Sequence, residues 1–138
     1  MVSKTFQINL TGYWQEENKS DIPHQSGIYC VYSGIYNRDL NQSSPSKLIY
    51  VGAAKNVNKE ISTHKELWEW KRYVEEGEQL CYTFGAVDPA DLQRCADAII
   101  FINKPPANSG TSDKFQFEDT TITLSGEIPF LRASFLVS

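Results

Sequence analysis

Two short runs rich in β-branched and aromatic residues lie close together in the sequence and limit how the chain can fold. Gly27–Tyr32 (GIYCVY) and Lys47–Ala53 (KLIYVGA) both have the composition of strands. The polar segment Asn37–Ser46 between them reads as a loop, and it is too short for the crossover that parallel strands require. We therefore expect two neighbouring antiparallel strands. A second Gly-Ile-Tyr, at 34–36, runs directly into the loop, and we interpret this copy as a coincidence.

Two helices are expected after this strand pair. Asn56 is a favourable N-cap for a helix over Val57–Glu76, which would end at Gly77. Asp88 and Pro89 are typical of the start of a second helix, because a short acidic residue caps and proline fits the first turn. The second helix has an apolar stripe at helical spacing, formed by Leu92, Cys95, Ala96, Ile99 and Ile100.

The remaining elements complete the predicted fold. Phe6–Trp14 and Leu80–Val87 are expected as strands, and 115–137 as a closing β-hairpin. We expect a single domain over 1–138. The order of elements predicts an α/β fold of the α+β type, with a small, mainly antiparallel central sheet flanked by helices and closed by the C-terminal β-hairpin.

Charge and cysteine usage narrow the function classes. The chain has 13 Lys and Arg against 17 Asp and Glu, which disfavours nucleic acid as a partner because such proteins usually present a basic stripe. No apolar run is long enough to span a membrane, and the first residues do not have the pattern of a secretory signal. No metal or other cofactor is expected. Three widely spaced cysteines indicate buried free thiols and a cytoplasmic location: Cys30, Cys81 and Cys95.

Four segments, in order along the chain, resemble the GIY-YIG nuclease family. The first Gly-Ile-Tyr ends at Tyr29, and Tyr50-Val51-Gly52 corresponds to the second half of the family name. Ala53–His64 resembles the family's first helix, and Ala96–Asn108 resembles a later helix with its Lys-Pro-x-x-Asn ending. The resemblance covers 27–108, and the longer loop between the two tyrosines looks like an insertion.

The resemblance implies a particular hydrolytic site. Members of the family cleave phosphodiesters with tyrosines from the paired strands, an arginine on the first helix and a metal-binding glutamate on the later helix. Here Tyr29 and Tyr50 stand at the tyrosine positions, and Lys55 and His64 also fit the pattern. Such a site must deprotonate a water and stabilise the charge that develops on the phosphate.

The two charged positions depart from the family. The family's arginine falls on Glu60 and its metal-binding glutamate on Ala96. Glu60 would repel the scissile phosphate, and losing one preorganised group typically costs about 2.7–4 kcal/mol of transition-state stabilisation. Asp97 stands next to Ala96, but one helical residue is a rotation of about 100°. The resemblance therefore implies a degenerate site.

The leading hypothesis is a non-catalytic GIY-YIG-like domain that acts by binding a protein or small-molecule partner. We expect Lys55 to approach Glu60 and neutralise a tyrosine-lined cleft. We interpret Trp68, Trp70 and Tyr73 as core and rim aromatics, although an exposed tryptophan among them would indicate a binding face. The candidate binding residues are Tyr29, Tyr50, Gly52, Lys55 and Asp97.

Two alternatives remain open. The first is an active nuclease that depends on Mg²⁺ or Mn²⁺ and has relocated its ligands to Asp97 and to a cation such as Lys55 or Arg72. The second is a structural or regulatory protein whose similarity to the family sheet is incidental. Metal binding separates the first alternative from the leading hypothesis, and the geometry of Tyr29 against Tyr50 bears on the second.

Overall fold

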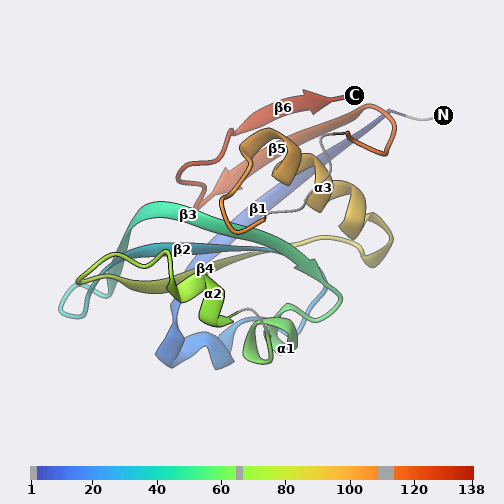
Figure 1. Ribbon diagram of the computed structural model, residues 1–138. Helices are drawn as coiled ribbons and strands as arrows, with labels where there is room; N and C mark the ends of the chain where they lie inside the picture. The colour runs from blue at the N-terminus through green and yellow to red at the C-terminus, as the bar shows by residue number, and fades with distance from the viewer. Residues whose placement is uncertain (1–2, 65–66, 109–113) are drawn as a thin grey trace.

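The computed structural model describes residues 3–64, 67–108 and 114–138. These residues form strands, three α-helices and two short 3₁₀ helices (Figure 1). The strands are β1 (Lys4–Gln15), β2 (Gly27–Asn37), β3 (Gln42–Ala54), β4 (Gln79–Ala86), β5 (Thr120–Gly126) and β6 (Ser134–Val137). The helices are η1 (Glu16–Asp21), α1 (Val57–Ser62), α2 (Leu67–Lys71), η2 (Pro89–Asp91) and α3 (Leu92–Asn103).

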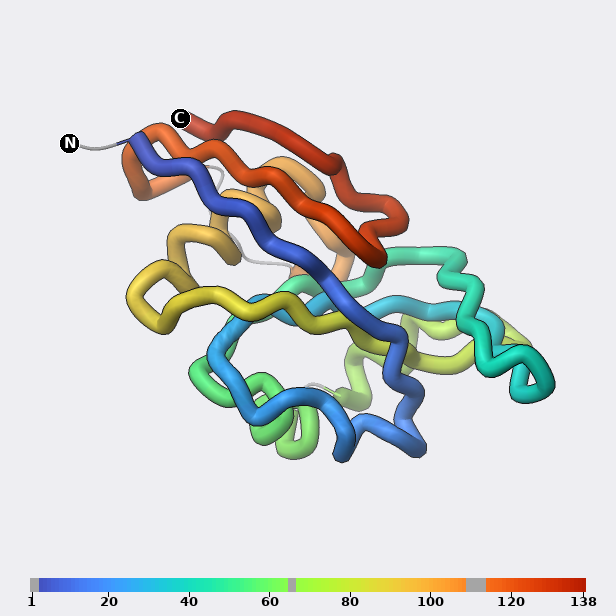
Figure 2. Tube along the Cα trace, turned by 180° about the vertical axis from the view of Figure 1, so that it is seen from behind, coloured from blue at the N-terminus to red at the C-terminus, as the bar shows by residue number. Residues whose placement is uncertain are grey.

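All the strands belong to one curled sheet in the order β3-β2-β4-β1-β5-β6. Neighbouring strands are antiparallel except β1 and β5, which pair in parallel from Lys4 opposite Thr120 to Leu10 opposite Gly126. Figure 2 shows β1 crossing the sheet diagonally, with β5 on one side and β4 on the other. The predicted α+β class, with a mainly antiparallel sheet flanked by helices and a C-terminal hairpin, is confirmed.

The β2–β3 hairpin is longer than the sequence predicted. The antiparallel pairing of the two expected strands is confirmed, with Tyr29 opposite Gly52. The predicted end of the first strand and the bounds of the loop were wrong, because 34–36 continue in β2 and the connection spans only 38–41. Two register shifts, after Val31 and after Ser33, let the hairpin bend without losing its ladder. The Tyr36 hydroxyl donates to the Asn41 side chain at 2.7 Å and closes the turn.

The sheet buries a separate hydrophobic core on each face. Successive residues of β2 point to opposite faces, so Ile28 and Cys30 contact one core while Tyr29 and Val31 contact the other. The first core lies under α3 and the second under α1 and α2 (Figure 1). The three thiols are buried as predicted, and burial raises the pKa of each to about 12.

The predicted length of the first helix was wrong. Asn56 caps it as expected, accepting from the Lys59 amide at 3.1 Å, but α1 ends at Ser62. The Ser62 and Thr63 hydroxyls donate to backbone carbonyls four residues earlier, which favours termination. Helical structure then resumes in the short α2. Residues 65 and 66, within the predicted helix, lie outside the described residues.

The second helix and the C-terminal hairpin follow the predicted order. The Asp88 side chain accepts from the Ala90 amide and caps η2, which leads into α3. The closing hairpin has shorter strands than 115–137, but its antiparallel pairing is present, with Thr120 opposite Val137. Within the described residues, no helix is both long and apolar enough to cross a lipid bilayer.

Candidate functional site

The first contact within the predicted site joins Tyr29 to Gly52. The two residues pair directly across β2 and β3, and the tyrosine ring lies over the glycine. A Cβ at Gly52 would come within 2.4 Å of the Tyr29 Cζ and 2.5 Å of its hydroxyl oxygen. Gly52 is therefore needed to admit the ring, which is 0% exposed. This contact explains the tyrosine and the glycine by packing alone.

Tyr29 belongs to an aromatic cluster that five side chains build under α1 and α2. The His64 and Trp70 ring centres are 4.2 Å apart, and Trp70 lies 5.2 Å from Tyr50. Tyr29 and Tyr50 are 6.0 Å apart, so the two predicted tyrosines do meet. Trp70 is fully buried, and its indole N–H has no partner among the described residues. The aromatic cluster consists of Tyr29, Tyr50, His64, Trp70 and Tyr82.

The Glu60 carboxylate lies at the edge of the aromatic cluster. The Tyr29 hydroxyl donates to Glu60 Oε2 at 3.4 Å, and His64 Nε2 lies 3.7 Å from the same oxygen. Burial, followed by the proximity of Tyr50 and Glu60, raises the pKa of Tyr29 above its usual range. The phenol therefore stays protonated and acts as a donor. Its hydroxyl is turned toward a carboxylate of the protein itself.

Lys55 does not take part in this arrangement. It is exposed on the connection between β3 and α1, and the described part of the chain shows no ion pair from it to Glu60. The expected neutralisation of Glu60 by Lys55 is therefore not found. Glu60 faces His64 instead, four residues further along the chain, which is the spacing of neighbours on one helix face.

The later helix contributes to a different face of the sheet. Ala96 is buried in the core under α3, whereas Tyr29 lies in the core under α1 and α2. Ala96 therefore does not join Tyr29, Tyr50 and Glu60 in one cleft. Counting along the sequence could not reveal this, because the face that a helix covers depends on how the chain crosses the sheet.

The residues of the alternative ligand set are also dispersed. Asp97 lies on α3, where Gln93 donates to it at 2.7 Å and partial burial raises its pKa. Arg72 is exposed just after α2, which lies on the opposite side of the sheet from α3 (Figure 1). Among the residues that the structure describes, no three His, Cys, Asp or Glu side chains are grouped closely enough to hold a metal ion.

Asn108 is a structural residue that the resemblance mentioned without a role. Its side chain donates to the Val51 carbonyl and accepts from the Val51 amide, both at 2.9 Å. The Ala107 amide also donates to the Ile49 carbonyl at 2.9 Å. Ala107 and Asn108 therefore pair with the outer edge of β3. A polar residue just after Pro105-Pro106 was the available sequence signal.

The predicted site is thus partly assembled: Tyr29, Tyr50, Gly52, Glu60 and His64 meet, and Lys55, Ala96 and Asp97 lie elsewhere. Sequence reasoning did not assign Trp70 or Tyr82 to this site, although both are large aromatic residues in predicted elements. Comparison with known proteins finds no matching family model, no matching curated protein and no matching solved structure.

Proposed function

We propose that the chain is a non-catalytic GIY-YIG-like domain that acts by binding a protein partner. The observation that supports the loss of catalysis is the contact between the Tyr29 hydroxyl and the Glu60 carboxylate. An anion at this point repels a phosphodiester, and a buried phenol with a raised pKa stays protonated at neutral pH and cannot accept a proton from water. The aromatic cluster then serves to hold α1 and α2 on the sheet.

The feature that supports partner binding is an exposed tryptophan beside the aromatic cluster. Trp68 is 63% exposed on α2, whereas Trp70, two residues on, is fully buried. Trp70 fixes α2 on the sheet and so holds Trp68 at the surface. Tryptophan is among the residues most enriched at the energetic centres of protein interfaces. We assign Trp68 as the anchor of the partner-binding face.

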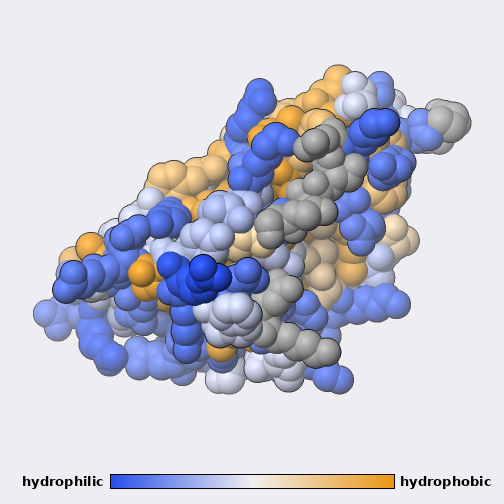
Figure 3. Space-filling view, in the orientation of Figure 1, coloured by the Kyte–Doolittle hydropathy of each residue, from blue (hydrophilic) through white to orange (hydrophobic). Residues whose placement is uncertain are grey.

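Among the described residues, the other exposed large hydrophobic side chains lie outside α2: Ile35, Leu40, Phe130 and Leu136. In the view of Figure 3, hydrophobic residues reach the surface mainly over the half that contains β5 and β6, and hydrophilic residues dominate around α1 and α2. An aromatic anchor with a polar rim is the pattern expected of a non-obligate interface. Leu40, also 63% exposed but on the β2–β3 turn, supplies a matched hydrophobic control.

The experiment compares Trp68→Ala with Leu40→Ala in affinity enrichment from the source cells. Proteins retained by the wild type are quantified by mass spectrometry, and each variant is first checked for an unchanged urea unfolding curve. We expect at least one protein to be retained by the wild type and by Leu40→Ala and to be lost with Trp68→Ala. Retention of every wild-type protein by Trp68→Ala contradicts the assignment.

A second experiment concerns nucleic acid. Fluorescence anisotropy with labelled single-stranded and duplex oligonucleotides across a salt series measures affinity and its salt slope. We expect no micromolar binding at about 0.15 M salt. Micromolar or tighter binding with a steep salt slope that Lys55→Ala weakens would favour a nucleic-acid-binding role.

A further inference from the structure

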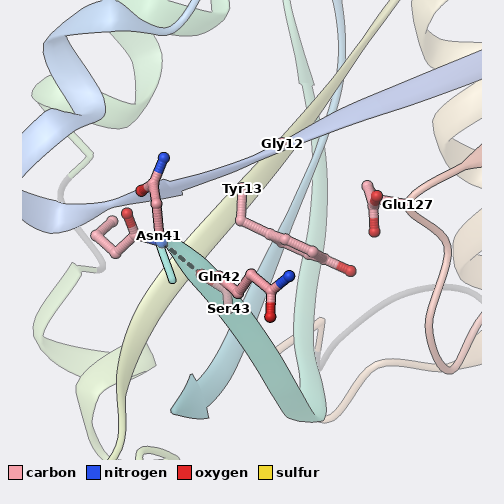
Figure 4. Close-up of a pocket in the computed structure, with 7 residues that line it drawn as sticks. Gly12, Tyr13, Asn41, Gln42, Ser43 and Glu127 are labelled. Carbon is pink, nitrogen blue, oxygen red and sulfur yellow. Dashed lines mark hydrogen bonds between the residues drawn. The ribbon is translucent and has the colours of Figure 1, made fainter. Parts of the chain in front are cut away.

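A polar cavity of about 360 Å³ lies on the part of the sheet away from the aromatic cluster. It forms where the end of β1 meets the turn of the β2–β3 hairpin and the residue that follows β5 (Figure 4). Its side chains come from Tyr13, Gln15, Asn41, Gln42, Ser43 and Glu127. None of the predicted site residues lines it.

The curled sheet builds this cavity. The β2–β3 hairpin extends through the second Gly-Ile-Tyr and bends back until Ser43 accepts a hydrogen bond from the Gln15 side chain (Figure 4). The Gln15 residue is only 3% exposed, so this wall of the cavity is a fixed, buried amide. The extra length of the hairpin therefore has a structural consequence that its sequence did not reveal.

Tyr13 projects into the cavity because β1 is irregular at this point. The register with β4 shifts between Gly12 and Trp14, which leaves Tyr13 without a partner on β4. In Figure 4 its side chain extends from β1 between Gln42 and Glu127. Bulges of this kind are common where a strand must redirect a side chain toward a functional site.

Glu127 is held in place by its backbone. Gly126, with φ of +86°, ends β5 in a conformation that favours glycine. A Cβ added at this position would lie only 2.2 Å from the Leu10 carbonyl oxygen. The Glu127 amide then donates to the Leu10 carbonyl at 2.8 Å. This tight turn brings the carboxylate to the cavity beside β1.

The chemistry of the lining is selective by charge. Glu127 is the one ionisable carboxyl group of the lining, and the lining has amides and hydroxyls but no lysine, arginine or histidine. Burial, with the nearby Glu127 carboxylate, raises the pKa of Tyr13, so its hydroxyl stays neutral. The Glu127 carboxylate would repel an anion here, whereas a cation would meet a carboxylate and an aromatic ring.

We propose that this cavity binds a small organic cation, an ammonium or guanidinium compound of about amino-acid size. Glu127 pairs with the charge, the Tyr13 ring forms one wall, and the amides of Gln15 and Gln42 take the remaining hydrogen bonds. The volume falls within the range of small-ligand pockets, roughly 300–1,000 Å³. The negative net charge of the chain, −4, also favours the approach of cations. This proposal is independent of the partner-binding role.

The test uses agmatine, which carries both an ammonium and a guanidinium group, as the probe. Titration into the isotope-labelled full chain is followed by two-dimensional amide NMR. We expect saturable shifts at Gly12, Tyr13, Ser43 and Glu127, with few changes at Tyr50 or Trp70. Glucose and succinate, a neutral and an anionic probe of similar size, are expected to leave these signals unchanged.

Matched variants separate the site from general charge effects. Glu127→Gln should weaken agmatine binding at least about tenfold, since the variant loses the charge-assisted hydrogen bond to the cation. Glu76→Gln makes the same charge change at an exposed position outside the cavity and should bind like the wild type. The amide spectra report whether each variant is folded. Absent shifts, equal binding by Glu127→Gln, or a response to glucose or succinate in place of agmatine would overturn the proposal.

Discussion

Adding one methyl group at Gly52 should destabilise the fold through Tyr29. The new Cβ would lie 2.4 Å from Cζ and 2.5 Å from the hydroxyl oxygen, whereas nonbonded carbons prefer about 3.5–4.0 Å. Tyr29 is fully buried, so its ring has no solvent space to move into. So close an approach puts the overpacking cost near the upper end of about 1–3 kcal/mol, and Gly→Ala recovers about 0.4–1 kcal/mol through the unfolded chain, which leaves a net loss of about 2–2.6 kcal/mol.

The assay is urea unfolding of a double-mutant cycle, followed by circular dichroism. In a Tyr29→Leu background the atoms nearest the new Cβ are gone, so Gly52→Ala should become neutral or slightly stabilising. Tyr32→Leu is the matched control, because Tyr32 is equally buried on the same strand but in the other core. In the Tyr32→Leu background, Gly52→Ala should still lower the free energy of unfolding. An unchanged free energy of unfolding in Gly52→Ala, or an equal cost in the Tyr29→Leu background, would refute the packing argument.

Three further predictions concern stability and thiol chemistry. Asn108→Ala should lower the free energy of unfolding by about 1–3 kcal/mol in urea titrations, because the buried Val51 amide and carbonyl lose their side-chain partner. A loss below 0.5 kcal/mol would be at odds with the role of Asn108 at the β3 edge, taking about 0.5 kcal/mol as a typical surface effect. In a colorimetric thiol assay at neutral pH, all three cysteines should stay unreactive in the native protein and react in denaturant; rapid native reaction would contradict their burial. Stability should be full below about pH 9 and fall as pH rises further, because folded thiols with a pKa of about 12 hold protons that unfolded thiols, near 9.0, release. Each buried thiol adds about 1.4 kcal/mol per pH unit to the decrease in the free energy of unfolding. A urea midpoint that stays constant from pH 9 to 11 at ~25 °C would contradict this. Buried phenols, whose pKa values burial also raises, should add to the fall above pH 10: Tyr29, Tyr32 and Tyr82.

Local features of the fold were predictable because their causes lie within a few residues. The Asn56 and Asp88 caps follow from side chains that reach the next turn of backbone. The antiparallel pairing of β2 and β3 follows from a short connection, whatever the length of the strands. The meeting of Tyr29 with Gly52 and Tyr50 depends on that pairing alone.

The rest depended on distant segments. The parallel pairing of β1 with β5 joins residues more than a hundred positions apart, and no local pattern encodes it. From the sequence, the second Gly-Ile-Tyr looked like the end of a strand. The hairpin extends beyond it and curls until Ser43 meets Gln15 of β1, a contact with a distant segment that no local pattern indicates. The cavity at Tyr13 and Glu127 likewise combines a bulge with a turn at the far end of the chain.

At the two positions where the family has charged residues, the sequence indicated the residue types but not their surroundings in the fold. The reversal of charge at Glu60 was visible in the sequence, but its contact with Tyr29 depends on how α1 packs against the sheet. Ala96 was correctly expected on the buried stripe of α3. Which face of the sheet that stripe covers is set by the crossover, and this removes Ala96 from the tyrosine site.

The most direct test of the non-catalytic role is a cleavage assay with Mg²⁺ or Mn²⁺. Purified protein is incubated with single-stranded and duplex DNA, and products are compared with a chelator control. We predict no metal-dependent cleavage, because the Tyr29 hydroxyl faces Glu60 and Asp97 lies on the opposite side of the sheet. Metal-dependent cleavage that Asp97→Ala abolishes, and that Asp39→Ala at an exposed turn leaves intact, would contradict the proposal and favour an active nuclease with relocated ligands.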